Sequence, residues 1–152
     1  MISKYNLIRN LLLLFCLNHL AACNQNGDRG FKKLSAADRM QHKQYVANGR
    51  VLYLRFCSNC HQKDGSGLGQ LYPPLKDADY LKADVNRTVR IIRYGMEGEI
   101  MVNGIKYDQS MPSNPKFTPL DISEITAYIY KEFADTTVLL KPNDIERLLL
   151  TK

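Results

Sequence analysis

Cysteine and histidine side chains stand close together at residues 57–61, which read Cys-Ser-Asn-Cys-His. Two thiols three positions apart on a helical turn lie on one face, so each can add to a vinyl group on the same side of a porphyrin. The next residue, His61, is then held beneath the iron as its proximal ligand. The pattern predicts covalent attachment of one haem c through Cys57 and Cys60.

Three other uses of these cysteines compete with haem attachment. A redox-active dithiol is expected in a βαβ context, which the sequence around the motif lacks. Half of a zinc site needs a second pair of ligands, but the other histidines are His19 near the N-terminus and His42 upstream. A disulfide across three residues of a helix has poor geometry. Haem attachment therefore fits the pattern best.

With this motif the chain resembles the class I cytochromes c, small monohaem electron carriers, over roughly residues 39–133. The resemblance implies an all-α cytochrome c fold, in which helices pack around a covalently bound haem, with a small β-hairpin excursion. It also implies an electron carrier rather than an enzyme. Its partners would be redox proteins that donate and accept electrons.

A helix is expected ahead of the motif, because residues 36–60 contain no proline and carry apolar side chains on one face. Gly49 in its interior costs about 1 kcal/mol relative to alanine, which suggests a close approach of another backbone. In the resembled family such a glycine and an aromatic, here Gly49 and Tyr53, mark the crossing with a C-terminal helix. Ile125 and Tyr128 fit the partner positions on that helix.

Shorter signals place the remaining elements. Asp84 is a plausible N-cap and Gly95 a plausible C-terminal stop for a helix between them. An Asn-Gly dipeptide between apolar residues predicts a hairpin over residues 100–107. Thr118 as N-cap, followed by proline, opens the last core helix, which runs to Phe133.

The resemblance implies a proline carbonyl that accepts the Nδ1–H of the haem-ligating histidine. Two prolines, at positions 73 and 74, follow the glycine-containing segment after the motif. Pro74 is the candidate for this role. Such a bond would fix the ring of His61 and raise its basicity.

A sixth ligand is expected because an electron carrier keeps both axial positions of the iron filled. Met111 lies in the sequence Ser-Met-Pro-Ser-Asn-Pro just before the last core helix, as the methionine ligand does in the resembled family. Met96 is the second candidate. Met101 falls in a predicted strand and is expected in the core, and Met40 precedes the motif. We therefore expect His61 and Met111 as the axial ligands of the haem iron.

The N-terminal segment has the parts of an export signal. Lys4 and Arg9 precede an apolar run that is shorter than the roughly 20 residues a membrane span needs. The run ends in Leu-Ala-Ala-Cys, which resembles the bacterial lipobox, so Cys23 is expected to be lipidated. A plain signal peptide or an uncleaved anchor is the alternative.

Four segments follow from these signals: a lipoprotein signal peptide (1–22), a tether (23–38), a cytochrome c domain (39–133) and a C-terminal extension (134–152). The extension contains a possible short helix and is assigned no function. The chain is then expected in the bacterial cell envelope, lipid-anchored to a membrane and facing the periplasm.

Composition agrees with one folded domain. Of 152 residues, 45% are hydrophobic and 24% charged, which argues against wholesale disorder. Loss of Lys4 and Arg9 with the signal lowers the net charge from +6 to +4. No long basic run is present, so no nucleic-acid partner is expected. A row formed by Arg87, Arg90 and Arg93 is interpreted as a solvated face, with docking to an acidic redox partner as the alternative.

The expected function is periplasmic-side electron transfer by a membrane-tethered monohaem cytochrome c. One alternative is a haem-based sensor or ligand-binding module with a labile sixth ligand. Another is an electron-accepting subunit of a larger oxidoreductase.

Overall fold

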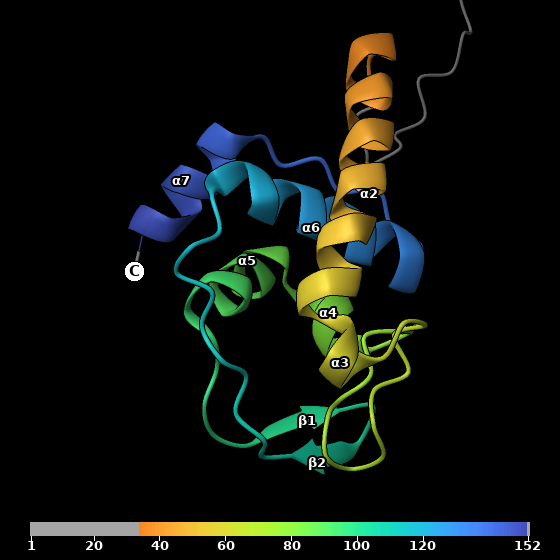
Figure 1. The fold of residues 1–152 in the computed structure, drawn as a ribbon, viewed down its shortest axis with the longest axis vertical. Coiled ribbons are helices and arrows are strands. Elements are labelled where there is room, and N and C mark those ends of the chain that lie inside the picture. The colour runs from red at the N-terminus through yellow and green to blue at the C-terminus, as the bar shows by residue number, and fades with distance from the viewer. Residues whose placement is uncertain (1–33, 152) are drawn as a thin grey trace, which may run out of the picture. The chain divides into compact units, whose positions relative to one another are not determined.

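A computed structural model of the protein describes residues 34–151. Cys23, the predicted signal peptide and most of the predicted tether lie outside these described residues. The elements run in the order α2 (Ala36–Phe56), α3 (Ser58–His61), α4 (Asp79–Ala83), α5 (Val85–Tyr94), β1 (Ile100–Val102), β2 (Ile105–Tyr107), α6 (Pro119–Phe133) and α7 (Pro142–Leu150) (Figure 1). The mostly helical fold with one small hairpin confirms the predicted fold class.

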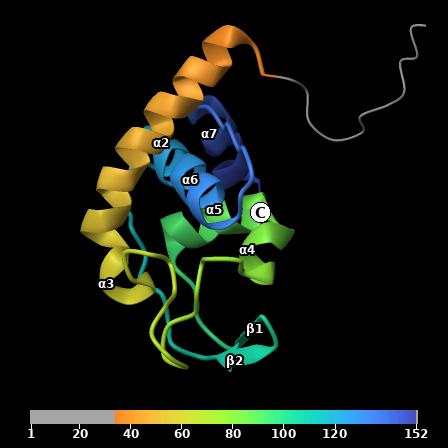
Figure 2. The same cartoon turned by 90° about the vertical axis from the view of Figure 1, so that its right-hand side faces the viewer.

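The long helix α2 crosses α6, and this contact forms the centre of the core (Figures 1 and 2). At Gly49 the two backbones approach so closely that a Cβ would lie 1.9 Å from the carbonyl oxygen of Glu124. One turn further along α2, the rings of Tyr53 and Tyr128 lie with their centroids 5.3 Å apart. Tyr53 and Ile125 are almost completely buried. The predicted crossing is therefore confirmed.

The helix ends follow the predicted caps. The side chain of Asp84 accepts hydrogen bonds from two backbone N–H groups at the start of α5, and Gly95 ends that helix with a φ of 76°. At the start of α6, Thr118 and Asp121 form a reciprocal capping box. These local signals fix where the two helices stop and start.

The hairpin β1–β2 turns at Asn103 and Gly104, which both have positive φ, as a two-residue I′ turn requires. Val102 and Tyr107 are buried on its inner side. Side chains alternate along a strand, so Met101, next to Val102, points outward and is 53% exposed. The expectation that Met101 belongs to the core is wrong for this reason.

Residues on both sides of the predicted domain 39–133 join the folded unit. Helix α7 packs on α5 and α6, and Ile145 is fully buried. The ammonium of Lys141 lies 3.0 Å from a carboxylate oxygen of Asp38 near the start of α2. The compact unit consequently begins at Leu34 and includes the C-terminal extension.

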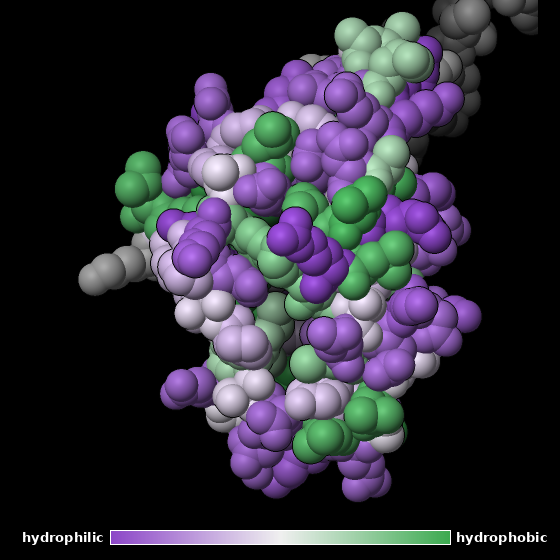
Figure 3. Space-filling model, in the orientation of Figure 1, coloured by the Kyte–Doolittle hydropathy of each residue, from purple (hydrophilic) through white to green (hydrophobic). Residues whose placement is uncertain are grey.

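The face of the molecule shown in Figure 3 is largely polar. Hydrophilic residues cover most of the face in Figure 3, and hydrophobic residues interrupt them in the middle and along the lower edge. Between residues 34 and 151, no helix combines the length and the apolar character needed to cross a membrane.

Candidate functional site

Cys57 lies where α2 ends and α3 begins, so the helix predicted to continue to residue 60 is divided there. Its φ of −116° departs from helical values. The backbone nevertheless continues in a tight turn, because the N–H groups of Cys60 and His61 both donate to the carbonyl of Cys57, at 3.2 and 3.0 Å. This short turn carries all three residues of the motif.

The Nδ1 atom of His61 lies 3.0 Å from the carbonyl oxygen of Pro73. A carbonyl can only accept, so Nδ1 carries the proton and donates it in this bond. The other ring nitrogen, Nε2, is then free to bind a metal ion. The prediction that Pro74 supplies this carbonyl is wrong by one residue, because the carbonyl that faces the ring is the one between the two prolines.

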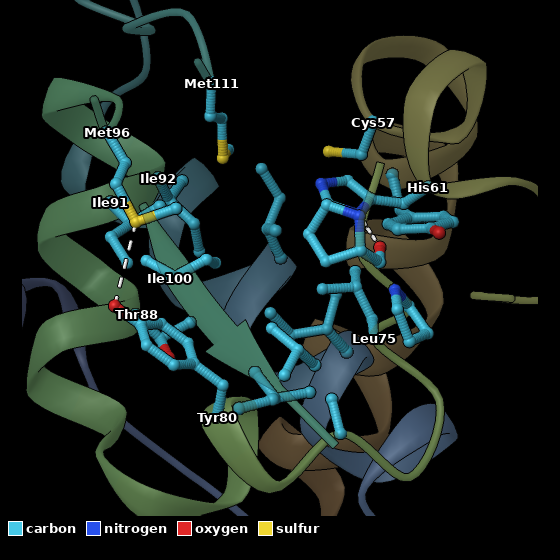
Figure 4. Close-up of a pocket in the computed structure, with 18 residues that line it drawn as sticks. Cys57, His61, Leu75, Tyr80, Thr88, Ile91, Ile92, Met96, Ile100 and Met111 are labelled. Atoms are coloured by element: carbon cyan, nitrogen blue, oxygen red, sulfur yellow. Dashed lines mark hydrogen bonds between the residues drawn. The ribbon is translucent and has the colours of Figure 1, made fainter. Parts of the chain in front are cut away.

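A cleft with about 660 Å³ of space opens beside His61. Cys57, His61, Pro73 and Pro74 belong to its lining, and Figure 4 shows Cys57 and His61 on the same side of it. The rest of the lining is mostly aliphatic and aromatic, and includes Leu75, Tyr80, Ile91, Ile92, Ile100 and Val102. Cys60 is on α3 but is not part of this lining. A concave and mostly apolar lining of this kind is typical of a small-molecule or cofactor site.

Two methionines line the side of the cleft opposite the motif. Met111 points into the cleft across from His61, and Met96 lies beside it and is turned toward Tyr80 (Figure 4). Their backbones form an isolated antiparallel bridge, in which each N–H donates to the other carbonyl at 2.9 Å. Met40 and Met101 are well exposed and line no part of the cleft. Of the four methionines considered, two therefore reach the site.

Burial adjusts the chemistry of the motif. Desolvation lowers the pKa of His61, so the ring is neutral at pH 7 and can offer a lone pair. Desolvation, helped by the nearby Cys60, raises the pKa of Cys57 to about 12. Cys57 and Cys60 form no disulfide. Both thiols are thus available for covalent chemistry.

The residues present fit a haem. An apolar cleft suits the macrocycle, a buried neutral histidine with an oriented ring suits the iron, and a thioether faces that ring from the other side. A zinc site fits less well, because within the described chain no three His, Cys, Asp or Glu side chains gather as metal ligands would. The structure therefore supports the haem reading of the motif over the zinc reading.

The arginine row has a role that the sequence did not suggest. Arg87 donates to the carbonyl of Tyr80, Arg90 donates to that of Thr151 at 2.9 Å, and Arg93 donates to that of Phe117 at 2.6 Å. All three side chains are half-buried. The interpretation as a simple solvated face is therefore wrong, since each arginine ties α5 to a backbone carbonyl outside this helix.

Tyr80 is the site residue that sequence reasoning missed. Its hydroxyl lies 3.7 Å from the sulfur of Met96, and its ring is covered by the guanidinium of Arg87 at 3.6 Å. The two partners are 16 and 7 residues away along the chain, so no short motif marks the contact. Tyr53 was expected only to pack against the C-terminal helix. Its hydroxyl also donates a hydrogen bond to the carbonyl of Gln62, next to His61, at 2.6 Å.

Comparison with known proteins agrees with this geometry. The family model for cytochrome c matches residues 46–131. Two proteins named cytochrome c-552, both from Thermus thermophilus and one of them from a specified strain of that species, are each 30% identical to this chain over 93 residues. The matched region covers 59% of this chain, 70% of the first relative and 62% of the second.

Proposed function

Because this chain belongs to the cytochrome c family, we propose that it carries electrons through one haem whose iron is bound by His61 and Met111. Haem-based electron transfer and covalent attachment of haem c are properties of the family. The axial ligands, the attachment residues and the place of the protein in the cell are the finer parts of this proposal.

The observation that carries the proposal is the position of Met111. Its side chain faces His61 across the apolar cleft (Figure 4). A thioether is a soft ligand that favours the reduced iron and so raises the reduction potential. When bound, the haem supplies a reversible one-electron exchange between ferric and ferrous iron.

The chain's own residues prepare this exchange. Pro73 holds the proximal ring in one orientation through the bond from His61. The apolar lining of the cleft would exclude water from a bound haem and would so limit rearrangement of the surroundings during electron exchange. The bridge between Met96 and Met111 fixes the backbone that presents the distal ligand. The alternative of a haem-based sensor with a labile sixth ligand is not supported by a comparable contact among the described residues.

Cys57 and Cys60 are proposed to form the two thioether bonds. The double variant Cys57→Ala/Cys60→Ala should lose covalent haem completely, as haem staining of a denaturing gel would show. Asn59→Ala, between the two cysteines, is the matched control and should keep the stain. Persistent staining in the double variant would refute the attachment sites.

Met111→Leu tests the distal ligand. The variant should lose the long-wavelength Met–iron absorption band of the ferric protein and should have a lower reduction potential. Met101→Leu replaces an exposed methionine and should leave both properties unchanged. A normal band in Met111→Leu would show that another residue binds the iron.

We also propose that the domain is held at a membrane by lipid on Cys23 and faces the periplasm, where redox proteins donate and accept its electrons. The support is the signal-like sequence before Cys23. More than one acyl chain would hold such a domain stably. The intact mass of the mature protein would report cleavage, acylation and haem together, and Cys23→Ser should release the protein from washed membranes. Acyl-free mature protein would overturn the anchor.

A further inference from the structure

Met96 raises a question that the proposed ligation leaves open. Two thioethers line the same cleft, and the backbone bridge places their residues directly opposite each other. Both sulfurs have the same chemistry toward iron. Something in the chain must therefore decide which of them binds, because an iron that exchanged between two ligands would change its surroundings from one molecule to the next.

A contact with Tyr80 distinguishes Met96 from Met111. The Tyr80 hydroxyl donates to the Met96 sulfur over 3.7 Å, within the range of a hydrogen bond to sulfur. In Figure 4 the Met96 side chain is turned toward Tyr80, away from His61, whereas Met111 extends toward the histidine. Met111 has no such partner at its sulfur among the hydrogen bonds of the described residues.

Tyr80 is itself held in place. Its backbone carbonyl accepts a hydrogen bond from Arg87, and the same guanidinium lies over its ring with 3.6 Å to the centroid. Arg87 is in the first turn of α5, whose start is fixed by the Asp84 cap. The hydroxyl therefore occupies one defined position at the edge of the cleft.

We propose that Tyr80 is a positioning residue that holds Met96 away from the iron and so leaves the axial site to Met111. The inference rests on the proposed His61–Met111 ligation. It predicts that loss of the hydroxyl frees Met96 to compete for the iron. The ring and its contact with Arg87 remain in Tyr80→Phe, so this substitution removes the hydrogen bond alone.

The test uses the haem-loaded protein and imidazole as a competing ligand. In Met111→Leu, Met96 is the remaining thioether of the cleft lining. Adding Tyr80→Phe to that variant should make Met96 a better competitor and weaken imidazole binding about 2- to 10-fold, the range that one typical hydrogen bond covers. The same addition should raise the strength of any Met–iron absorption band.

Met96→Leu provides the matched control. In Met96→Leu/Met111→Leu, the further change Tyr80→Phe should leave the imidazole affinity unchanged. An unchanged affinity in the Met111→Leu background would overturn the inference. So would an equal loss in both backgrounds, because Tyr80 would then act without Met96.

Failure of the underlying ligation gives a different result. A full Met–iron band in Met111→Leu with Tyr80 intact would mean that Met111 is not the ligand. Loss of the band there, with no effect of Tyr80→Phe on imidazole binding, would leave the ligation standing and refute the role of Tyr80.

Discussion

At the crossing of α2 and α6 the two helices pack closely against each other, whereas the elements around the cleft leave an open space between them. The crossing has Gly49 against the Glu124 carbonyl and the ring of Tyr53 against that of Tyr128. On the cleft side, single hydrogen bonds fix loops, among them the bridge between Met96 and Met111.

The crossing and the cleft have different roles. Close packing makes the crossing costly to alter, so it supplies stability. The cleft leaves room for a cofactor, so its walls depend on loop geometry and on the ligand itself. Substitutions at crossing positions away from the cleft should therefore change the free energy of unfolding without changing the spectrum. Substitutions of residues that line the cleft, which include Tyr53 and Ile125 of the crossing, should change both.

Gly49→Ala should have the largest effect. The new Cβ would overlap the Glu124 carbonyl, a backbone atom that cannot move without shifting α6. We expect a loss of about 3 kcal/mol or more in the free energy of unfolding, measured by denaturant titration of the haem-loaded protein. Val51→Ala, at an exposed position of the same helix, should stay within about 0.5 kcal/mol of the parent. Equal stabilities for the two variants would contradict the close approach.

Ile145→Ala extends the comparison to α7. Ile145 is fully buried although it lies outside the region matched by the family model. Truncation should cost about 2 to 4 kcal/mol and leave the absorption spectrum unchanged. Leu150→Ala, at the 83% exposed end of the same helix, should be nearly neutral. A neutral Ile145→Ala would show that the extension does not belong to the folded unit.

Gly95→Ala probes the cleft side. Gly95 has a φ of 76°, and a Cβ there would lie 2.4 Å from the Met111 carbonyl oxygen. We expect a smaller loss of about 1 to 3 kcal/mol, together with a weaker Met–iron band as the Met111 backbone moves. Gly98→Ala also has positive φ but open space around the Cβ, so it should lose about 1 kcal/mol through strain alone and keep the band. Identical spectra for both variants would argue against this coupling.

His42 should give the smallest effect, on the pH dependence of stability. Burial, and then the charge of Lys131, lower its pKa from 6.5 in the folded protein. The unfolded chain therefore binds more protons just below pH 6.5, so this contribution to stability is complete above that pH and is lost as the pH falls. His42→Gln should flatten the decline that begins below about pH 6.5, and Lys131→Met should flatten it partly. An unchanged slope in His42→Gln would assign the decline to other groups.

Local sequence signals predicted the elements well and the site in part. The Asp84 and Thr118 caps and the Asn103-Gly104 turn are decided by neighbouring residues, and the structure shows them as predicted. The spacing of Cys57, Cys60 and His61 likewise predicted a single helical turn, which the structure shows as α3. Where a few consecutive residues decide the outcome, the sequence was enough.

Contacts between distant residues could not be predicted in this way. Which of two adjacent proline carbonyls faces His61 depends on how a loop folds back over 12 residues. Arg93 reaches a carbonyl 24 residues away and Arg90 one 61 residues away. The pairing of Tyr80 with Met96 is of the same kind. Such partners are set by tertiary packing, which periodicity does not encode.

The length of α2 has a consequence for how an anchored form of this domain would be presented. Its 21 residues, at a rise of about 1.5 Å each, make a rod about 30 Å long. The chain enters this rod near Ala36 and leaves it at the first cysteine of the motif, so the two lie at opposite ends (Figure 2). Any attachment upstream of Ala36 would therefore join the domain at the end of α2 that lies opposite the Cys57–His61 motif.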